Sequence, residues 1–107
     1  MRNQPGPSMA APTSEQLAPL KRLWTAANGH FGQCKYIVEF LLGLYNGTRF
    51  PVDLAGFRAL DQAIFRDCLT VLQMDSQPQQ EVHLLLGCLI GEFEKLAEDW
   101  RIPDRSI

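Results

Sequence analysis

The sequence predicts an all-α domain, a compact bundle of four helices that follows a disordered N-terminal tail. Apolar residues recur at steps of three and four in four separate stretches, and this is the period of an amphipathic helix. Glycine, asparagine, proline and serine interrupt these stretches, and such residues end helices or form turns. No stretch alternates apolar and polar residues as a half-buried strand would. We expect a tail over residues 1–12, a helical bundle over residues 13–101 and a C-terminal tail over residues 102–107.

The first two predicted helices are each closed by the dipeptide Asn-Gly. The first begins near Thr13 and ends at residues 28–29. The second runs from about Gly32 to Tyr45 and ends at residues 46–47. Glycine after the last helical turn is a common helix stop. The second helix carries an apolar stripe at helical spacing, which consists of Cys34, Ile37, Val38, Leu41, Leu42 and Tyr45.

The third predicted helix runs from Leu54 to about Met74, and Asp53 is suited to cap it. Gly56 weakens its first turn, so the alternative is a short separate turn with Asp61 as a second cap. The apolar face of this helix is broad, which favours a central position in the bundle.

The fourth helix is predicted as one continuous element from about Pro78 to Trp100. Two glycines, Gly87 and Gly91, lie inside it and together cost about 2 kcal/mol relative to alanine. A close approach between helices would compensate for that cost, because missing side chains let backbones come near. The approach is either internal to the bundle or a homodimer contact through Gly87 and Gly91.

Charge and cysteine content restrict the class of protein. The net charge is −2, which argues against a nucleic-acid partner because phosphate binding relies on Lys and Arg. Residues 1–58 carry six basic and three acidic side chains, whereas residues 59–107 carry four basic and nine acidic side chains. The three cysteines are widely spaced within apolar runs, as expected of reduced thiols in a cytoplasmic protein.

The most apolar stretch, at 82–91, is about half the length needed to cross a bilayer, so we expect no membrane segment.

The glycine-punctuated stretch before the second helix does not match a known reactive motif. Gly29 and Gly32 are followed by Gln33 and Cys34, whereas a P-loop needs Lys and then Ser or Thr. A Cys34–His30 pair would need a third group to orient the imidazole, and Cys34 falls on the apolar stripe. The stretch is therefore interpreted as a turn between helices.

No other pattern predicts chemistry. Histidines and cysteines lack the spacing of metal ligands. The carboxylates Glu94 and Glu98 flank Lys95 on what reads as a solvated helix face. We therefore predict no catalytic residue, no cofactor and no metal.

The crossing between the second and third helices is the best candidate for binding a protein partner. Tyr45, Arg49 and Phe50 are residue types enriched in binding hot spots, and binding residues favour loops held by a rigid scaffold. We expect Arg49 to be exposed and add Arg58 to this partner-binding set. The alternative for Phe50 is a core side chain tucked under the loop.

One pattern extends over the predicted helices and consists of Gly29, Gly32, Gln33, Phe40, Leu41, Leu42, Tyr45, Asn46, Asp53, Leu54, Phe57, Asp61, Phe93, Glu94, Leu96 and Trp100. This pattern resembles an uncharacterised family of short helical proteins carried by integrative-conjugative elements, plasmids and phages of proteobacteria. The resemblance spans about residues 20–101 and departs from the family at Tyr45, where tryptophan is expected, and over residues 49–51, where relatives are rich in glycine. No activity is attached to the family, so the resemblance implies a genomic context and no catalytic residue.

These observations favour a non-enzymatic protein-binding accessory or regulatory protein of a mobile element or phage, which modulates a host or defence complex. A helical DNA-binding transcriptional regulator is the alternative, and its basic face would consist of Lys21, Arg22, Lys35, Arg49 and Arg58. A third hypothesis is an enzyme whose site is assembled from His30, Cys34 and Asp61.

Overall fold

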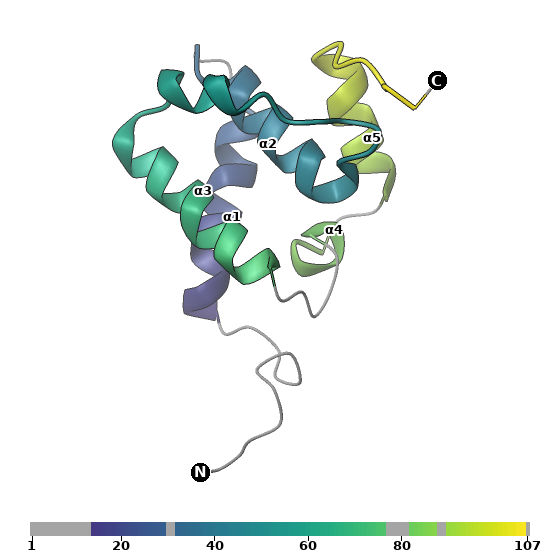
Figure 1. Cartoon of the computed structure of the whole chain (residues 1–107). Coiled ribbons are helices and arrows are strands. Elements are labelled where there is room, and N and C mark those ends of the chain that lie inside the picture. Colours follow the sequence, from purple (N-terminus) through teal and green to yellow (C-terminus); the bar gives the residue numbers. More distant parts are fainter. Residues whose placement is uncertain (1–13, 30–31, 77–81, 88–89, 107) are drawn as a thin grey trace.

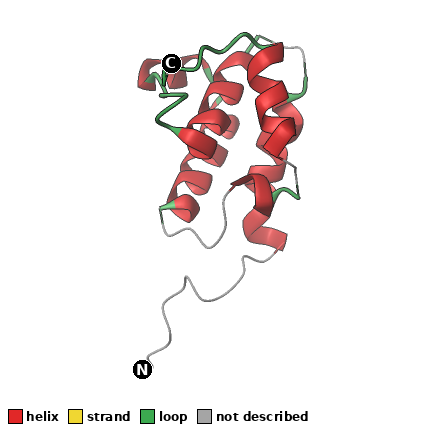
Figure 2. Ribbon diagram, turned by 90° about the vertical axis from the view of Figure 1, so that its right-hand side faces the viewer, coloured by secondary structure: helices red, strands yellow, loops and turns green. Residues whose placement is uncertain are grey.

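The computed structural model describes residues 14–29, 32–76, 82–87 and 90–106. These residues form helices and connecting segments and contain no strand (Figure 2), which confirms the all-α prediction. The predicted tail over residues 1–12 lies outside the described part. The elements in chain order are α1 Ser14–Ala27, α2 Cys34–Asn46, the 3₁₀ helix η2 Leu54–Ala59, α3 Gln62–Asp75, α4 Val82–Leu85 and α5 Ile90–Asp99 (Figure 1).

Helix α2 is the centre of the bundle. It contacts α1, α4, α5 and η2, and its apolar stripe is buried as predicted, apart from the partly exposed Tyr45. Phe40 is also buried, against the ring of Phe57 in η2 at a centroid distance of 5.7 Å. The prediction that the third helix is central is wrong. Helix α3 packs mainly on α1, and two leucines of its broad apolar face, Leu69 and Leu72, remain 49% and 48% exposed.

An aromatic stack joins the C-terminal helix to the first two. Phe93 of α5 is fully buried, and its ring stacks on Trp24 of α1 at 4.9 Å and on Tyr45 of α2 at 5.0 Å between centroids. Stacked or edge-on aromatic pairs contribute roughly 0.5–1.5 kcal/mol each beyond the area that they bury. Phe93 therefore anchors α5 to both α1 and α2.

The segment after α2 turns back and runs along that helix before it enters η2 (Figure 1). Gly43 makes this close passage possible. A Cβ atom at Gly43 would lie 2.1 Å from Val52 Cγ2 and 3.3 Å from the carbonyl oxygen of Phe50. Phe50 is 3% exposed, so the crossing covers α2 with a core side chain.

The third predicted helix is divided into two elements. Asp53 accepts a hydrogen bond from the Ala55 N–H at 3.0 Å and caps η2. A break at Leu60 follows, and α3 begins after Asp61. This confirms the alternative of a separate turn, although the Asp61 side chain makes no capping hydrogen bond. Gln33 supplies a different contact there, because its Oε1 accepts a hydrogen bond from the Asp61 N–H at 2.5 Å.

The prediction of one continuous fourth helix is wrong. Helix α4 ends at Leu85 and α5 begins at Ile90. Gly87 has φ +73°, a left-handed conformation that glycine adopts without steric cost, so it ends α4. A Cβ atom added at Gly87 or at Gly91 would have no described neighbour within 4 Å. The expected close internal approach at these glycines is therefore wrong, and a homodimer contact through them stays a prediction.

Candidate functional site

Arg49 lies at the centre of a polar cluster that joins three parts of the chain. Its Nη1 and Nη2 donate to the two carboxylate oxygens of Glu94 in α5 at 2.6 and 2.8 Å. Its Nε donates to Asp104 Oδ2 at 2.7 Å. The Tyr45 hydroxyl donates to Glu94 Oε2 at 2.5 Å. The two-pronged pairing with Glu94 fixes the orientation of the guanidinium and also neutralises its charge.

The same cluster holds the C-terminal segment on the body of the domain. The Arg105 N–H donates to the Arg49 carbonyl at 2.7 Å, and Ile102 packs against the hydrophobic core. Asp104 also accepts hydrogen bonds from the hydroxyl and backbone N–H of Ser106. The segment expected as a C-terminal tail is therefore attached to the crossing over residues 102–106.

These contacts change the interpretation of the predicted partner-binding set. The expectation of an exposed Arg49 is wrong, because its side chain is 27% exposed and paired with Glu94 and Asp104. Phe50 is a core side chain, as the alternative stated. Tyr45 is partly buried, and Arg58 is exposed in the last turn of η2. The structure thus brings Tyr45 and Arg49 together around Glu94. Of the predicted partner-binding residues, only Arg58 is exposed to solvent.

The Glu94 side chain is 38% exposed, but it is paired with Arg49, which its assignment to a solvated face did not anticipate; Glu98 is exposed. Hydrogen bonds from Arg49, followed by that from Tyr45, lower the pKa of Glu94. Hydrogen bonds from Ser106, followed by that from Arg49, lower the pKa of Asp104 to about 2. Burial and then the Glu94 carboxylate raise the pKa of Tyr45. The cluster therefore favours charged carboxylates and a neutral phenol.

This cluster predicts a loss of stability in acid. Carboxylates whose pKa is lower in the folded state stabilise the fold above their ordinary pKa, near 4, and lose that contribution as pH falls through the folded value. The free energy of unfolding should therefore decline from about pH 4 down to about 2. Urea denaturation across this range should show a shallower decline for Arg49→Gln. Arg58→Gln is the matched control, and equal slopes in Arg49→Gln and the parent would contradict the assignment.

The thiol of the enzyme hypothesis is not accessible to solvent. Cys34 is fully buried, and its Sγ donates to the Ala26 carbonyl at 3.1 Å. Asp61 lies at the start of α3, and His30 and Cys88 lie outside the described residues. Cys68 is also buried, and burial raises the pKa of its thiol to about 12. Both described thiols are structural side chains in this conformation.

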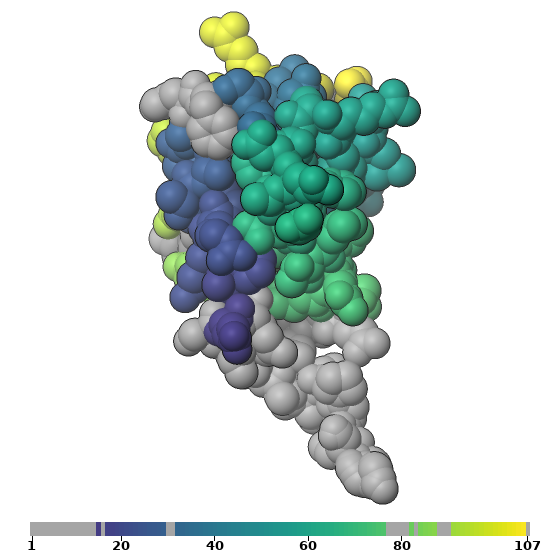
Figure 3. Space-filling model, turned by 90° about the vertical axis from the view of Figure 1, so that its left-hand side faces the viewer, coloured from purple at the N-terminus to yellow at the C-terminus, as the bar shows by residue number. Residues whose placement is uncertain are grey.

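An exposed apolar surface lies where η2 meets α3. We define the η2–α3 surface as Leu54, Phe57, Leu69 and Leu72. Leu54 is 75% exposed, and Phe57 contacts Phe65 of α3 edge-on at 5.8 Å. Figure 3 shows α3 and η2 on one face of the molecule, beside α1. The surface borders a hollow of about 170 Å³, lined by Phe40, Gly43, Leu44, Val52, Leu54, Phe57 and Leu72.

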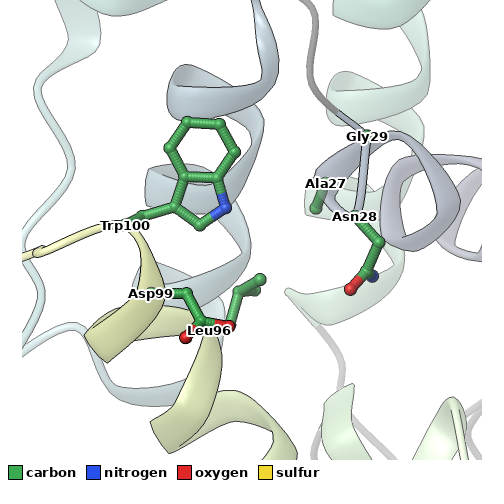
Figure 4. Close-up of a pocket in the computed structure, with 6 residues that line it drawn as sticks. All are labelled: Ala27, Asn28, Gly29, Leu96, Asp99 and Trp100. Atoms are coloured by element: carbon green, nitrogen blue, oxygen red, sulfur yellow. The ribbon is translucent and has the colours of Figure 1, made fainter.

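A larger open cleft of about 500 Å³ lies between the C-terminal ends of α1 and α5. In Figure 4, Trp100 and Asn28 stand on opposite sides of it, with Leu96 and Asp99 below. Asn28 Nδ2 donates to the Trp24 carbonyl at 2.8 Å, and Asp99 accepts from Lys95 at 2.8 Å. The cleft therefore combines an indole with an amide and a carboxylate that already have partners within the domain.

The basic face of the DNA-binding alternative is partly neutralised. Arg22 makes a two-pronged pair with Asp67 at 2.9 and 2.7 Å, and Arg49 is paired as described above. Lys21, Lys35 and Arg58 remain exposed. Two of the five cations therefore have carboxylate partners within the domain.

Among the residues that the structure describes, no group of three or more His, Cys, Asp or Glu side chains is placed to hold a metal ion. Within the same residues, no helix has the length and apolarity to span a membrane.

The fold and its surfaces define a small all-α domain with a partly buried polar cluster at one end and an exposed apolar surface on its side. The chain belongs to the family of unknown function DUF7673, whose model matches residues 17–101. This match confirms that the chain belongs to a family without an assigned activity, as the resemblance implied. Comparisons with curated proteins and with solved structures find no match.

Proposed function

We propose that the protein is a non-enzymatic accessory or regulatory protein that acts by binding another protein. The observation that supports the proposal is the η2–α3 surface, where Leu54, Leu69 and Leu72 are between 48% and 75% exposed. Contiguous exposed apolar side chains on a globular domain mark interaction surfaces. The resemblance to proteins of mobile elements and phages supports a role in modulating a host or defence complex of a bacterial cytoplasm.

The hollow beside this surface strengthens the proposal. Its lining residues are all apolar or glycine, and a pocket of this kind accepts an apolar anchor from a partner, the usual centre of a binding hot spot. A DNA-binding regulator receives less support, because Arg22 and Arg49 are paired with carboxylates of the same domain.

Affinity capture from a host lysate tests the proposal. Leu69→Gln and Leu72→Gln should each reduce capture of a specific partner about tenfold or more, as expected when an apolar contact in a hot spot is lost. Leu84→Gln is the matched control, since Leu84 is 55% exposed on α4, outside the η2–α3 surface. Circular dichroism should show the same helix content for all variants. Partners captured equally by all three variants and the parent would argue against the surface.

A further inference from the structure

We propose that the cleft between the C-terminal ends of α1 and α5 binds a guanidinium group, the charged group of an arginine side chain. Its volume of about 500 Å³ lies within the range of about 300–1,000 Å³ that is usual for ligand sites. The cleft shares no lining residue with the hollow beside the η2–α3 surface. The inference therefore goes beyond the proposed function and does not depend on it.

The electrostatic environment of the cleft favours a cation. The carbonyl ends of two helices meet there, and the C-terminal end of a helix carries a partial negative charge that attracts cations. Neither α1 nor α5 has a basic residue in its last turn. The last turn of α5 instead contains Glu98 and Asp99, at a helix end where carboxylates are unfavourable. Asp99 is the one charged side chain among the described residues that line the cleft, so a bound cation would offset this negative charge.

The ion pair between Lys95 and Asp99 leaves the carboxylate available to a ligand. The two side chains are 71% and 52% exposed, and exposed pairs of this kind hold their partners weakly. Lys95 Nζ donates to Asp99 Oδ2, and no described residue donates to the other carboxylate oxygen. A ligand cation can therefore bind Asp99 Oδ1 or displace the lysine.

Two further polar groups face the cleft from opposite walls. In Figure 4 the indole nitrogen of Trp100 and the amide oxygen of Asn28 lie on the sides of these residues that face each other. The Asn28 Nδ2 donates to the Trp24 carbonyl at 2.8 Å, which fixes the orientation of the amide. Within the described part of the chain, the Trp100 N–H has no acceptor and the Asn28 oxygen has no donor. The cleft thus offers acceptor oxygens on Asn28 and Asp99 and one N–H donor.

An arginine residue within a peptide matches this set of groups. Its guanidinium is always charged and carries five N–H donors in one plane, so it can reach the oxygens of Asp99 and Asn28 together, whereas the ammonium of lysine is a compact point charge. Its apolar stem can pack along the indole of Trp100. The peptide carbonyl of the same residue can accept the indole N–H. Free arginine should bind less tightly, because its carboxylate is repelled by Asp99.

Proton–nitrogen correlation NMR of the full chain tests this inference with N-acetyl-arginine amide as the probe. The indole N–H signal of Trp100 should shift and saturate as the probe is added. The indole of Trp24, which stacks on Phe93 and does not line the cleft, is the internal reference. N-acetyl-citrulline amide is the matched control probe, since a neutral urea replaces the guanidinium. It should bind about tenfold more weakly or less, because hydrogen bonds to a charged group are the stronger ones.

Three variants assign the binding to the carboxylate. Asp99→Asn should weaken binding of N-acetyl-arginine amide about fivefold or more, because the charge that pairs with the guanidinium is lost. Glu98→Gln removes an adjacent exposed carboxylate that does not line the cleft, so it should weaken binding much less. Lys95→Gln should strengthen binding, because it removes the lysine that competes for Asp99.

Three results would overturn the inference: an unchanged Trp100 signal, equal binding of the arginine and citrulline probes, or equal losses in Asp99→Asn and Glu98→Gln. A titration with free arginine identifies the source of the guanidinium. Weaker binding of free arginine than of the amide supports an arginine in a protein segment. Tighter binding of free arginine supports the same guanidinium site with the free amino acid as its ligand.

Discussion

Phe93→Ala is expected to reduce the free energy of unfolding by about 3–5 kcal/mol, the range for loss of a fully buried phenylalanine. Phe93 is 0% exposed, and its ring lies between those of Trp24 and Tyr45. Removal leaves a cavity and also abolishes both stacking contacts. Domains of ordinary size are stable by only about 5–15 kcal/mol, so this variant should be close to unfolding at room temperature. Urea denaturation followed by circular dichroism measures the difference.

Phe93→Leu is the matched control for this prediction. Leucine keeps an apolar side chain in the same position, while the stacking on Trp24 and Tyr45 is lost. Its cost should therefore be well below that of alanine, with a remainder near the value of the two aromatic contacts, about 1–3 kcal/mol in total. Equal stability of Phe93→Ala and the parent would show that α5 is not anchored in the way described.

Gly43→Ala is expected to destabilise the protein by about 1–3 kcal/mol, the usual cost of overpacking a core contact. Alanine favours a helix by about 1 kcal/mol over glycine, so helix propensity alone predicts the opposite sign. The steric term should prevail, because the added methyl would lie 2.1 Å from Val52 Cγ2 and 3.3 Å from a backbone oxygen. Valine has a stiff, branched side chain with little freedom to move aside. Thermal unfolding reports the sign directly.

Two further variants separate the cost of the steric clash with Val52 from the gain in helix propensity. Gly91→Ala places the same methyl on α5, where no described atom lies within 4 Å, and it should be neutral or stabilising by about 1 kcal/mol. Val52→Ala should recover part of the loss when combined with Gly43→Ala, because the clashing methyl is removed. Stabilisation by Gly43→Ala alone would mean that the crossing does not lie against α2.

Local patterns of the sequence predicted most helices because the signals for them lie within a few residues. The stripe of α2 indicated its face and length, and the Asn-Gly pairs marked the ends of α1 and α2 to within one or two residues. The division of the third helix, which falls at Leu60, was visible as an alternative because Gly56 weakens the first turn. The role of each glycine was ambiguous in the sequence. Gly87 ends a helix in a left-handed conformation, whereas Gly43 lies in the middle of a helix and allows a close passage of the chain. Composition does not distinguish these roles.

The polar cluster could not be predicted from local patterns. Arg49 pairs with Glu94 and Asp104, which lie 45 and 55 residues further along the chain. Helical spacing placed Glu94 next to Lys95 on an outer face of its helix. Helical spacing does not reveal that the crossing with Arg49 packs over that face. The contact between Gln33 and Asp61 is likewise a product of the tertiary fold, although both positions belong to the pattern that carried the family resemblance.

The apolar surface was partly visible in the sequence. The width of the apolar face of α3 was recognised, but a wide face fits a central helix as well as a helix with a partner outside the domain. The structure excludes the first interpretation, because α2 occupies the centre and Leu69 and Leu72 are about half exposed. The second interpretation corresponds to our proposed function. Leu54 was predicted on the apolar stripe at the start of this helix, but it begins η2 and is 75% exposed.

Our central claim is that the η2–α3 surface is a binding site for a protein. The most direct measurement places a photoreactive amino acid at Leu69 and, in a matched variant, at Leu84, which are 49% and 55% exposed, and irradiates intact cells. We expect a discrete cross-linked product from position 69 that is missing from position 84. No product from position 69, or an equal product from position 84, would contradict the claim.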